Sequence, residues 1–124
     1  MNSLVYALDE QIFRLKMVLR EVAMLRREVF TKVTELAELA EKTQDPAYRA
    51  RLLIFAKEHE YAHEFEKRLL KALDRLEDAR EELKARHVAR ALVLLQSALD
   101  ELSSHAPEIA YTIKRLAREV AGLA

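Results

Sequence analysis

The chain has 124 residues, and its 21 basic and 21 acidic side chains give a formal net charge of zero. This balance lacks the basic excess of nucleic-acid-binding proteins, so we expect no nucleic-acid partner. One glycine, two prolines and no cysteine exclude a disulfide framework and favour long helices over sheets. No apolar run is long enough to span a bilayer, and the first ten residues lack a signal-peptide pattern. We expect a cytoplasmic protein with one domain.

The first predicted helix covers residues 3–42. Apolar residues recur at steps of three and four from Val5 to Ala40, and only Arg26 interrupts this stripe. The spacing is that of a heptad seam held along a single long helix. Such a helix, about 60 Å long, has few contacts with itself and therefore needs a partner helix along its length.

The partner helix is predicted at residues 46–84, directly after the break Thr43-Gln44-Asp45-Pro46. Asp45 is suited to capping this helix, and Pro46 suits its first position. So short a turn requires the two helices to be antiparallel. The second helix carries its own three/four stripe, with His59 as the only polar member. The two stripes predict a helical hairpin.

Two shorter helices are predicted after the hairpin, at residues 87–102 and 106–122, separated by a break around Pro107. The segment Lys84, Ala85, Arg86, His87 and Val88 contains no helix breaker, so we interpret it as a conformational hinge. The sequence leaves open whether the second helix bends there or runs on into the third. The predicted fold class is all-α, a long antiparallel helical hairpin with two shorter C-terminal helices.

One string matches a metal-site pattern, His59-Glu60-Tyr61-Ala62-His63. In H-E-x-x-H zinc proteases two histidines bind the metal and the glutamate is the general base. The flanking charges and the absence of a predicted strand argue against this function, and the candidates for a third ligand are generic. Those candidates are Glu77, Glu81 and Glu82. The favoured interpretation is a half-buried His59 and a surface His63, without catalytic residues, cofactor or metal site. A zinc-dependent hydrolase and adventitious metal binding remain the alternatives.

Basic residues outnumber acidic ones in the middle of the first helix, from Gln11 to Thr34. They are Arg14, Lys16, Arg20, Arg26, Arg27 and Lys32. One interpretation is an ordinary solvated helix face. The other is contact with an anionic membrane surface, where each basic residue contributes roughly 1 kcal/mol and many copies add avidity. We take these six residues as candidate membrane-binding residues of a peripheral membrane protein.

Three further stretches are informative: REVFTKVTE at residues 27–35, RLLIFAKE at residues 51–58 and LSSHAPE at residues 102–108. Together they resemble the core of ESCRT-III proteins, especially the archaeal cell-division (CdvB-type) branch. Residues 27–35 (REVFTKVTE) are similar to the family's basic-E-L-F-x-K-V-x-E stretch. Residues 51–58 (RLLIFAKE) resemble its R-x-x-x-Y-A-x-E pattern, and residues 102–108 (LSSHAPE) resemble its L-x-x-x-x-P-E pattern. In this register His59 takes the place of an aliphatic residue.

The resemblance implies a polymer-forming scaffold subunit, not an enzyme, that remodels or severs membranes in cell division or vesicle formation. Its expected partners are further copies of itself, related subunits and an anionic membrane surface. It also implies a switch between a closed form, with the third helix folded back, and an open form with the second and third helices fused. The sequence, which ends at Ala124, does not contain the family tail that an AAA ATPase recognises, so direct ATPase binding is not expected. The alternative is a helical-bundle or coiled-coil adaptor that binds only protein.

Overall fold

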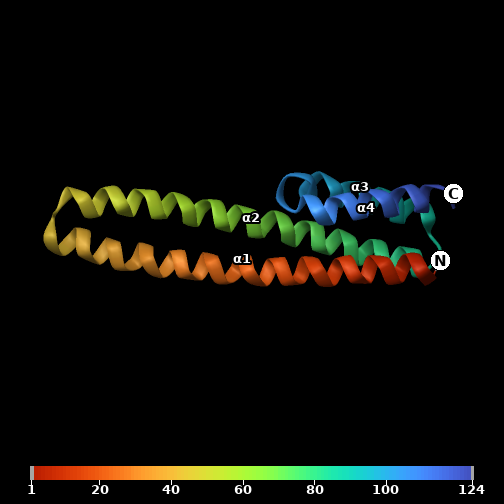
Figure 1. Cartoon of the computed structure of the whole chain (residues 1–124), viewed down its shortest axis with the longest axis horizontal. Coiled ribbons are helices and arrows are strands. Elements are labelled where there is room, and N and C mark those ends of the chain that lie inside the picture. Colours follow the sequence, from red (N-terminus) through yellow and green to blue (C-terminus); the bar gives the residue numbers. More distant parts are fainter. Residues whose placement is uncertain (1, 124) are drawn as a thin grey trace. The chain divides into compact units, whose positions relative to one another are not determined.

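The computed structural model describes residues 2–123, and it is all-helical with no strand in that range. Its helices are α1 (Asn2–Thr43), α2 (Pro46–Lys84), α3 (Val88–His105) and α4 (Pro107–Ala121) (Figure 1). The predicted all-α class, a long helical hairpin followed by two shorter helices, is confirmed. α3 continues to His105, beyond the expected end at Leu102, and the N–H of Ala106 closes it by donating to the Leu102 carbonyl.

The turn between α1 and α2 is short, and its few residues supply hydrogen bonds to both helix ends. The Thr43 hydroxyl donates to the Leu39 carbonyl at 2.7 Å, within the last turn of α1. Gln44 then adopts a left-handed conformation with φ 56°. Asp45 accepts the Ala47 N–H on Oδ1 at 2.9 Å, which is the N-cap that its position before Pro46 predicts.

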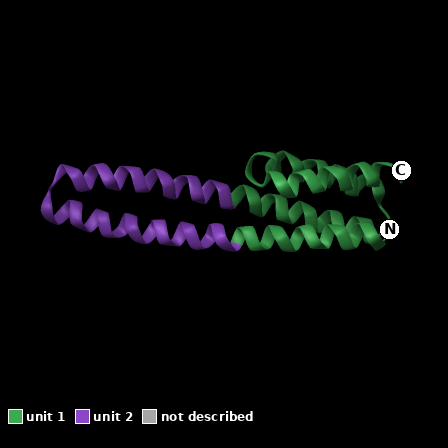
Figure 2. Cartoon of the chain, in the orientation of Figure 1, with its two compact units in different colours: residues 1–19, 67–124 green, residues 20–66 purple. Residues whose placement is uncertain are grey.

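The chain divides into two compact units, each described by itself (Figure 2). The four-helix unit contains the chain before Arg20 and the chain after Glu66, so it includes parts of α1 and α2 with all of α3 and α4. The hairpin unit is Arg20–Glu66, the end of α1, the turn and the start of α2. One domain was expected from the length of the chain.

The four-helix unit contains most of the buried apolar side chains. Those that are almost fully buried are Leu8, Leu15, Leu69, Leu76, Leu83, Leu95, Leu102, Ile113 and Val120. Each comes from the three/four stripe of its own helix, and full burial of such a side chain contributes about 1.5–3 kcal/mol. α3 folds back beside α2, where Arg68 Nη1 lies 3.4 Å from Glu101 Oε2 (Figure 1).

The hairpin unit has a thin core because each of its two helices has only one neighbour. Leu36 and Ala40 are its only buried apolar residues. The other apolar members of the two stripes are only half-buried, and they are Val22, Val29, Val33, Leu52, Phe55, Ala62 and Phe65. Several large apolar side chains outside the stripes are exposed, so this unit presents apolar surface to solvent.

Candidate functional site

The hinge predicted between residues 84 and 88 is a turn that ends α2 and starts α3. Arg86 has φ 63°, a left-handed conformation, although no glycine is present. The His87 N–H donates to the Glu82 carbonyl at 2.8 Å and the Arg86 N–H to the Leu83 carbonyl at 3.0 Å. This pair of bonds is the Schellman motif that commonly closes helices. The chain therefore turns at this point and α2 does not run on into α3, which is one of the two possibilities left open by the sequence.

The side chains around this turn add a polar contact that spans it. Nδ1 of His87 lies 2.7 Å from Oε2 of Glu82, the residue whose carbonyl accepts the His87 N–H. A Schellman turn usually places an apolar contact at these two positions. Here an imidazole and a carboxylate make this contact, so no apolar contact between these two positions stabilises the turn.

Two of the candidate membrane-binding residues lie in the four-helix unit. Arg14 pairs with Glu10 at 2.9 Å one turn earlier on α1, and Lys16 lies 4.0 Å from Glu77 of α2. Both basic side chains are more than half exposed, so these pairs contribute little to stability and leave the charges open to solvent. Met17, which follows Lys16 in the sequence, and Phe13, three residues before it, are also exposed.

Arg26 is part of the packing between the helices of the hairpin unit. Its Nε lies 2.7 Å from Glu66 Oε2, and both side chains are mostly buried. A guanidinium held in this way by a carboxylate of the opposite helix is not free to contact lipid headgroups. The sequence had placed Arg26 both in the core stripe and among the surface basic residues, and the structure puts it in the stripe.

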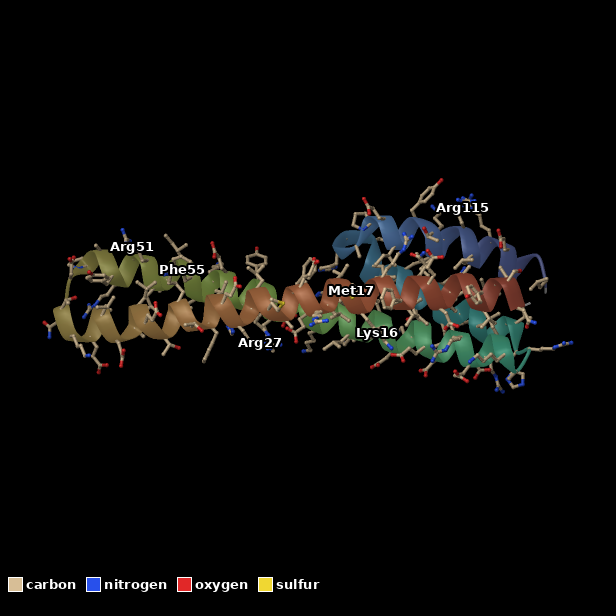
Figure 3. All side chains as sticks on the ribbon, turned by 60° about the horizontal axis from the view of Figure 1, so that its bottom comes forward. Lys16, Met17, Arg27, Arg51, Phe55 and Arg115 are labelled. Atoms are coloured by element: carbon tan, nitrogen blue, oxygen red, sulfur yellow. The ribbon has the colours of Figure 1, made fainter. Side chains whose placement is uncertain are left out.

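The other basic residues of the hairpin unit are exposed. Lys32 lies 4.0 Å from Glu35, whereas Arg20 and Arg27 have no ion pair with any residue in the range 2–123. Met24, which is 52 % exposed, lies between them at helical spacing. Figure 3 shows Arg27 directed away from its helix. Arg20, Met24 and Arg27 form a basic and apolar strip, the combination that interfacial helices present to anionic membranes.

The two histidines of the H-E-x-x-H string have different surroundings. His59 is half-buried with its ring 5.4 Å from that of Phe30, and its Nε2 is buried without a hydrogen-bond partner. His63 is exposed, and its ring lies 6.5 Å from that of His59. The nearest candidate for a third ligand, Glu77, lies about four turns, or roughly 20 Å, beyond His63 along α2. Residues 2–123 contain no group of three or more potential metal ligands.

The exposed apolar surface of the hairpin unit was not predicted from the sequence. One hollow of about 490 Å³ is lined by Val22, Leu25, Val29, Glu58, Tyr61, Ala62 and Phe65. A neighbouring hollow of about 400 Å³ is lined by Leu53, Ile54, Lys57, Glu58 and Tyr61. The available signal was the presence of large apolar residues outside the three/four stripe.

The fold and these surfaces define an all-helical protein with a thin, partly apolar hairpin unit. No helix within residues 2–123 combines the length and apolarity needed to cross a bilayer. Comparison with protein-family models, with curated proteins and with solved structures gave no match.

Proposed function

We propose that the chain is a polymer-forming, ESCRT-III-like scaffold subunit that remodels membranes from their cytoplasmic surface. The observation that carries this proposal is the folded-back α3, joined to α2 by a turn without glycine or proline. A subunit that switches between a closed form and a fused-helix form requires such a junction, because both forms must keep good helix propensity. The resemblance of three sequence stretches to this family supports the same assignment.

Membrane contact is assigned to the exposed strip Arg20, Met24 and Arg27. Two basic residues give weak, salt-sensitive attraction to anionic lipid, and repetition in a polymer makes attachment firm. Arg26 is left out of this surface because it is paired with Glu66. The partners in the proposal are further copies of the chain, related subunits and anionic lipid, bound peripherally.

Lipid binding is tested by co-sedimentation with phosphatidylserine vesicles at low and high salt. The variant Arg20→Glu/Arg27→Glu reverses both unpaired charges and should abolish binding at low salt. The control Arg14→Glu/Lys32→Glu makes the same change in net charge at residues that have acidic neighbours and should bind more tightly than the first variant. Equal binding by the two variants would refute the assigned surface.

The switch is tested separately with His87→Pro. The φ of His87 in the turn is −87°, close to the value that proline requires, although proline removes one hydrogen bond and restricts the left-handed Arg86 before it. A continuous helix through the same position is broken by proline. The variant should remain folded but lose assembly on vesicles. Unchanged assembly would exclude a fused-helix polymer.

A second candidate is a helical adaptor that binds only protein, favoured by the exposed apolar residues of the hairpin unit. An adaptor would show no dependence on lipid charge in the vesicle experiment, whereas the scaffold requires it.

A further inference from the structure

One face of α2 in the hairpin unit is apolar and largely exposed. Leu53 and Tyr61 are each 72 % exposed and Ile54 is 60 % exposed. Together with Lys57 and Glu58 they line the shallow hollow described above. Three large apolar side chains so close together are costly to leave in water, so this face is suited to a contact.

Two charges of opposite sign lie on either side of Tyr61 on this face. Lys57 is one turn before Tyr61, and Glu64 is almost one turn after it, so the three share one side of the helix. Both charged side chains are exposed, and neither forms an ion pair with another residue in the range 2–123. Both charges are therefore available for ion pairs with a partner chain.

This arrangement is complementary to itself when two α2 helices pair in opposite directions. With a two-fold axis between Glu60 and Tyr61, each position before the axis in one copy faces the position equally far after it in the other. Lys57 of each copy then faces Glu64 of the other copy, and the two Tyr61 side chains lie next to the axis. A parallel pair in register would instead place like charges opposite each other, which is unfavourable.

We propose that a second copy of this chain docks on the face around Tyr61, forming an antiparallel α2–α2 pair with two-fold symmetry. The pair covers Tyr61 of both copies and forms two Lys57–Glu64 ion pairs. A single helix-to-helix contact is at the small end of specific interfaces. The dimer is therefore modest in strength, and it forms at high protein concentration or where copies are crowded on a surface.

The inference rests on the self-association in the proposed function but not on its lipid binding. All its tests are therefore made in lipid-free solution. Loss of vesicle binding with intact dimers would refute the membrane role alone, and intact vesicle binding without dimers would refute the α2–α2 pair alone.

The position of the axis is tested by Tyr61→Cys. The chain contains no cysteine, so any covalent dimer must form through the introduced thiol. A residue next to a two-fold axis lies close to its own copy, so mild oxidation should convert most of this variant into disulfide-linked dimer. Glu38→Cys, at an exposed position of α1 in the same unit, is the control and should remain mostly monomeric. Equal cross-linking of the two variants, or none with Tyr61→Cys, would overturn the proposal.

Pairing of the charges is tested with charge-reversal variants and a double variant that restores opposite charges. Dimer affinity is measured by sedimentation velocity. Lys57→Glu and Glu64→Lys should each weaken the dimer at least tenfold, because each places like charges at both ion pairs. The double variant Lys57→Glu/Glu64→Lys restores opposite charges and should recover most of the affinity. Helicity measured by circular dichroism should be the same in all three variants, because both positions are exposed. Failure of the double variant to recover would contradict the antiparallel register.

Discussion

Arg26 of α1 donates from Nε to Oε2 of Glu66 of α2 at 2.7 Å, with both side chains mostly buried in the hairpin unit. Arg26 is the one polar interruption of the apolar stripe of α1. Its long aliphatic portion follows the stripe while its guanidinium meets a carboxylate from the facing helix. This pair joins the two helices in the same unit where the apolar core is thinnest.

The Arg26–Glu66 pair should contribute measurably to stability. Arg26→Ala leaves a mostly buried carboxylate without its partner and should lower the free energy of unfolding by about 1–2 kcal/mol. Glu66→Ala should cost a similar amount. The double variant should cost less than the sum of the two single variants, which urea denaturation of the four proteins measures. Additive losses would show that the pair does not form in solution.

Burial in the four-helix unit predicts very different effects for the same substitution along α2. Leu76 is fully buried and Leu70 is 46 % exposed. Leu76→Ala removes contacts and leaves a cavity, so it should cost about 2–5 kcal/mol. Leu70→Ala is the matched control and should change stability by less than about 0.5 kcal/mol. Thermal denaturation compares the two, and similar losses would contradict the packing of this unit.

Much of the fold was predictable because its signals are local. The spacing of apolar residues set the helices, and Asp45 with Pro46 set the tight turn that makes them antiparallel. Whether the chain turns after α2 or runs on into α3 was not predictable, because Arg86 takes a left-handed conformation that is usual for glycine. The hydrogen bonds from the Arg86 and His87 N–H groups accompany that conformation, and no residue type in this segment announces them.

The candidate surfaces were harder to predict than the fold. Charge counting along α1 could not separate Arg26, which pairs with α2, from Arg27, which is exposed. They are adjacent in sequence, but successive residues of a helix point about 100° apart, so only the position of the facing helix distinguishes their roles. The exposure of Tyr61 and Ile54 likewise depends on which face of α2 has no neighbour.

The Asp9–Arg80 pair in the four-helix unit should contribute equally to the free energy of unfolding at neutral and at alkaline pH. Arg80 Nη1 lies 3.1 Å from Asp9 Oδ1, and this hydrogen bond raises the pKa of the Arg80 guanidinium. A raised pKa contributes stability that is fully present below the unfolded-state pKa and is lost only as the pH rises through the higher folded-state pKa. Asp9→Asn should therefore cost the same at pH 7 and pH 10, below about 1 kcal/mol because the pair is partly exposed. A cost that shrinks by pH 10 would contradict this.

Replacement of Arg86 by glycine reports which form of the α2–α3 junction exists in solution. In the folded-back form, Arg86 has a positive φ that glycine adopts without strain, so Arg86→Gly should stabilise the protein by about 0.5–1 kcal/mol. In a fused α2–α3 helix the same residue would be helical, and glycine would cost about 1 kcal/mol instead. Lys84→Gly, in the last turn of α2, is the control and should be destabilising in both forms. Urea denaturation of monomeric protein gives the sign, and a loss of stability in Arg86→Gly would place the free chain in the fused form.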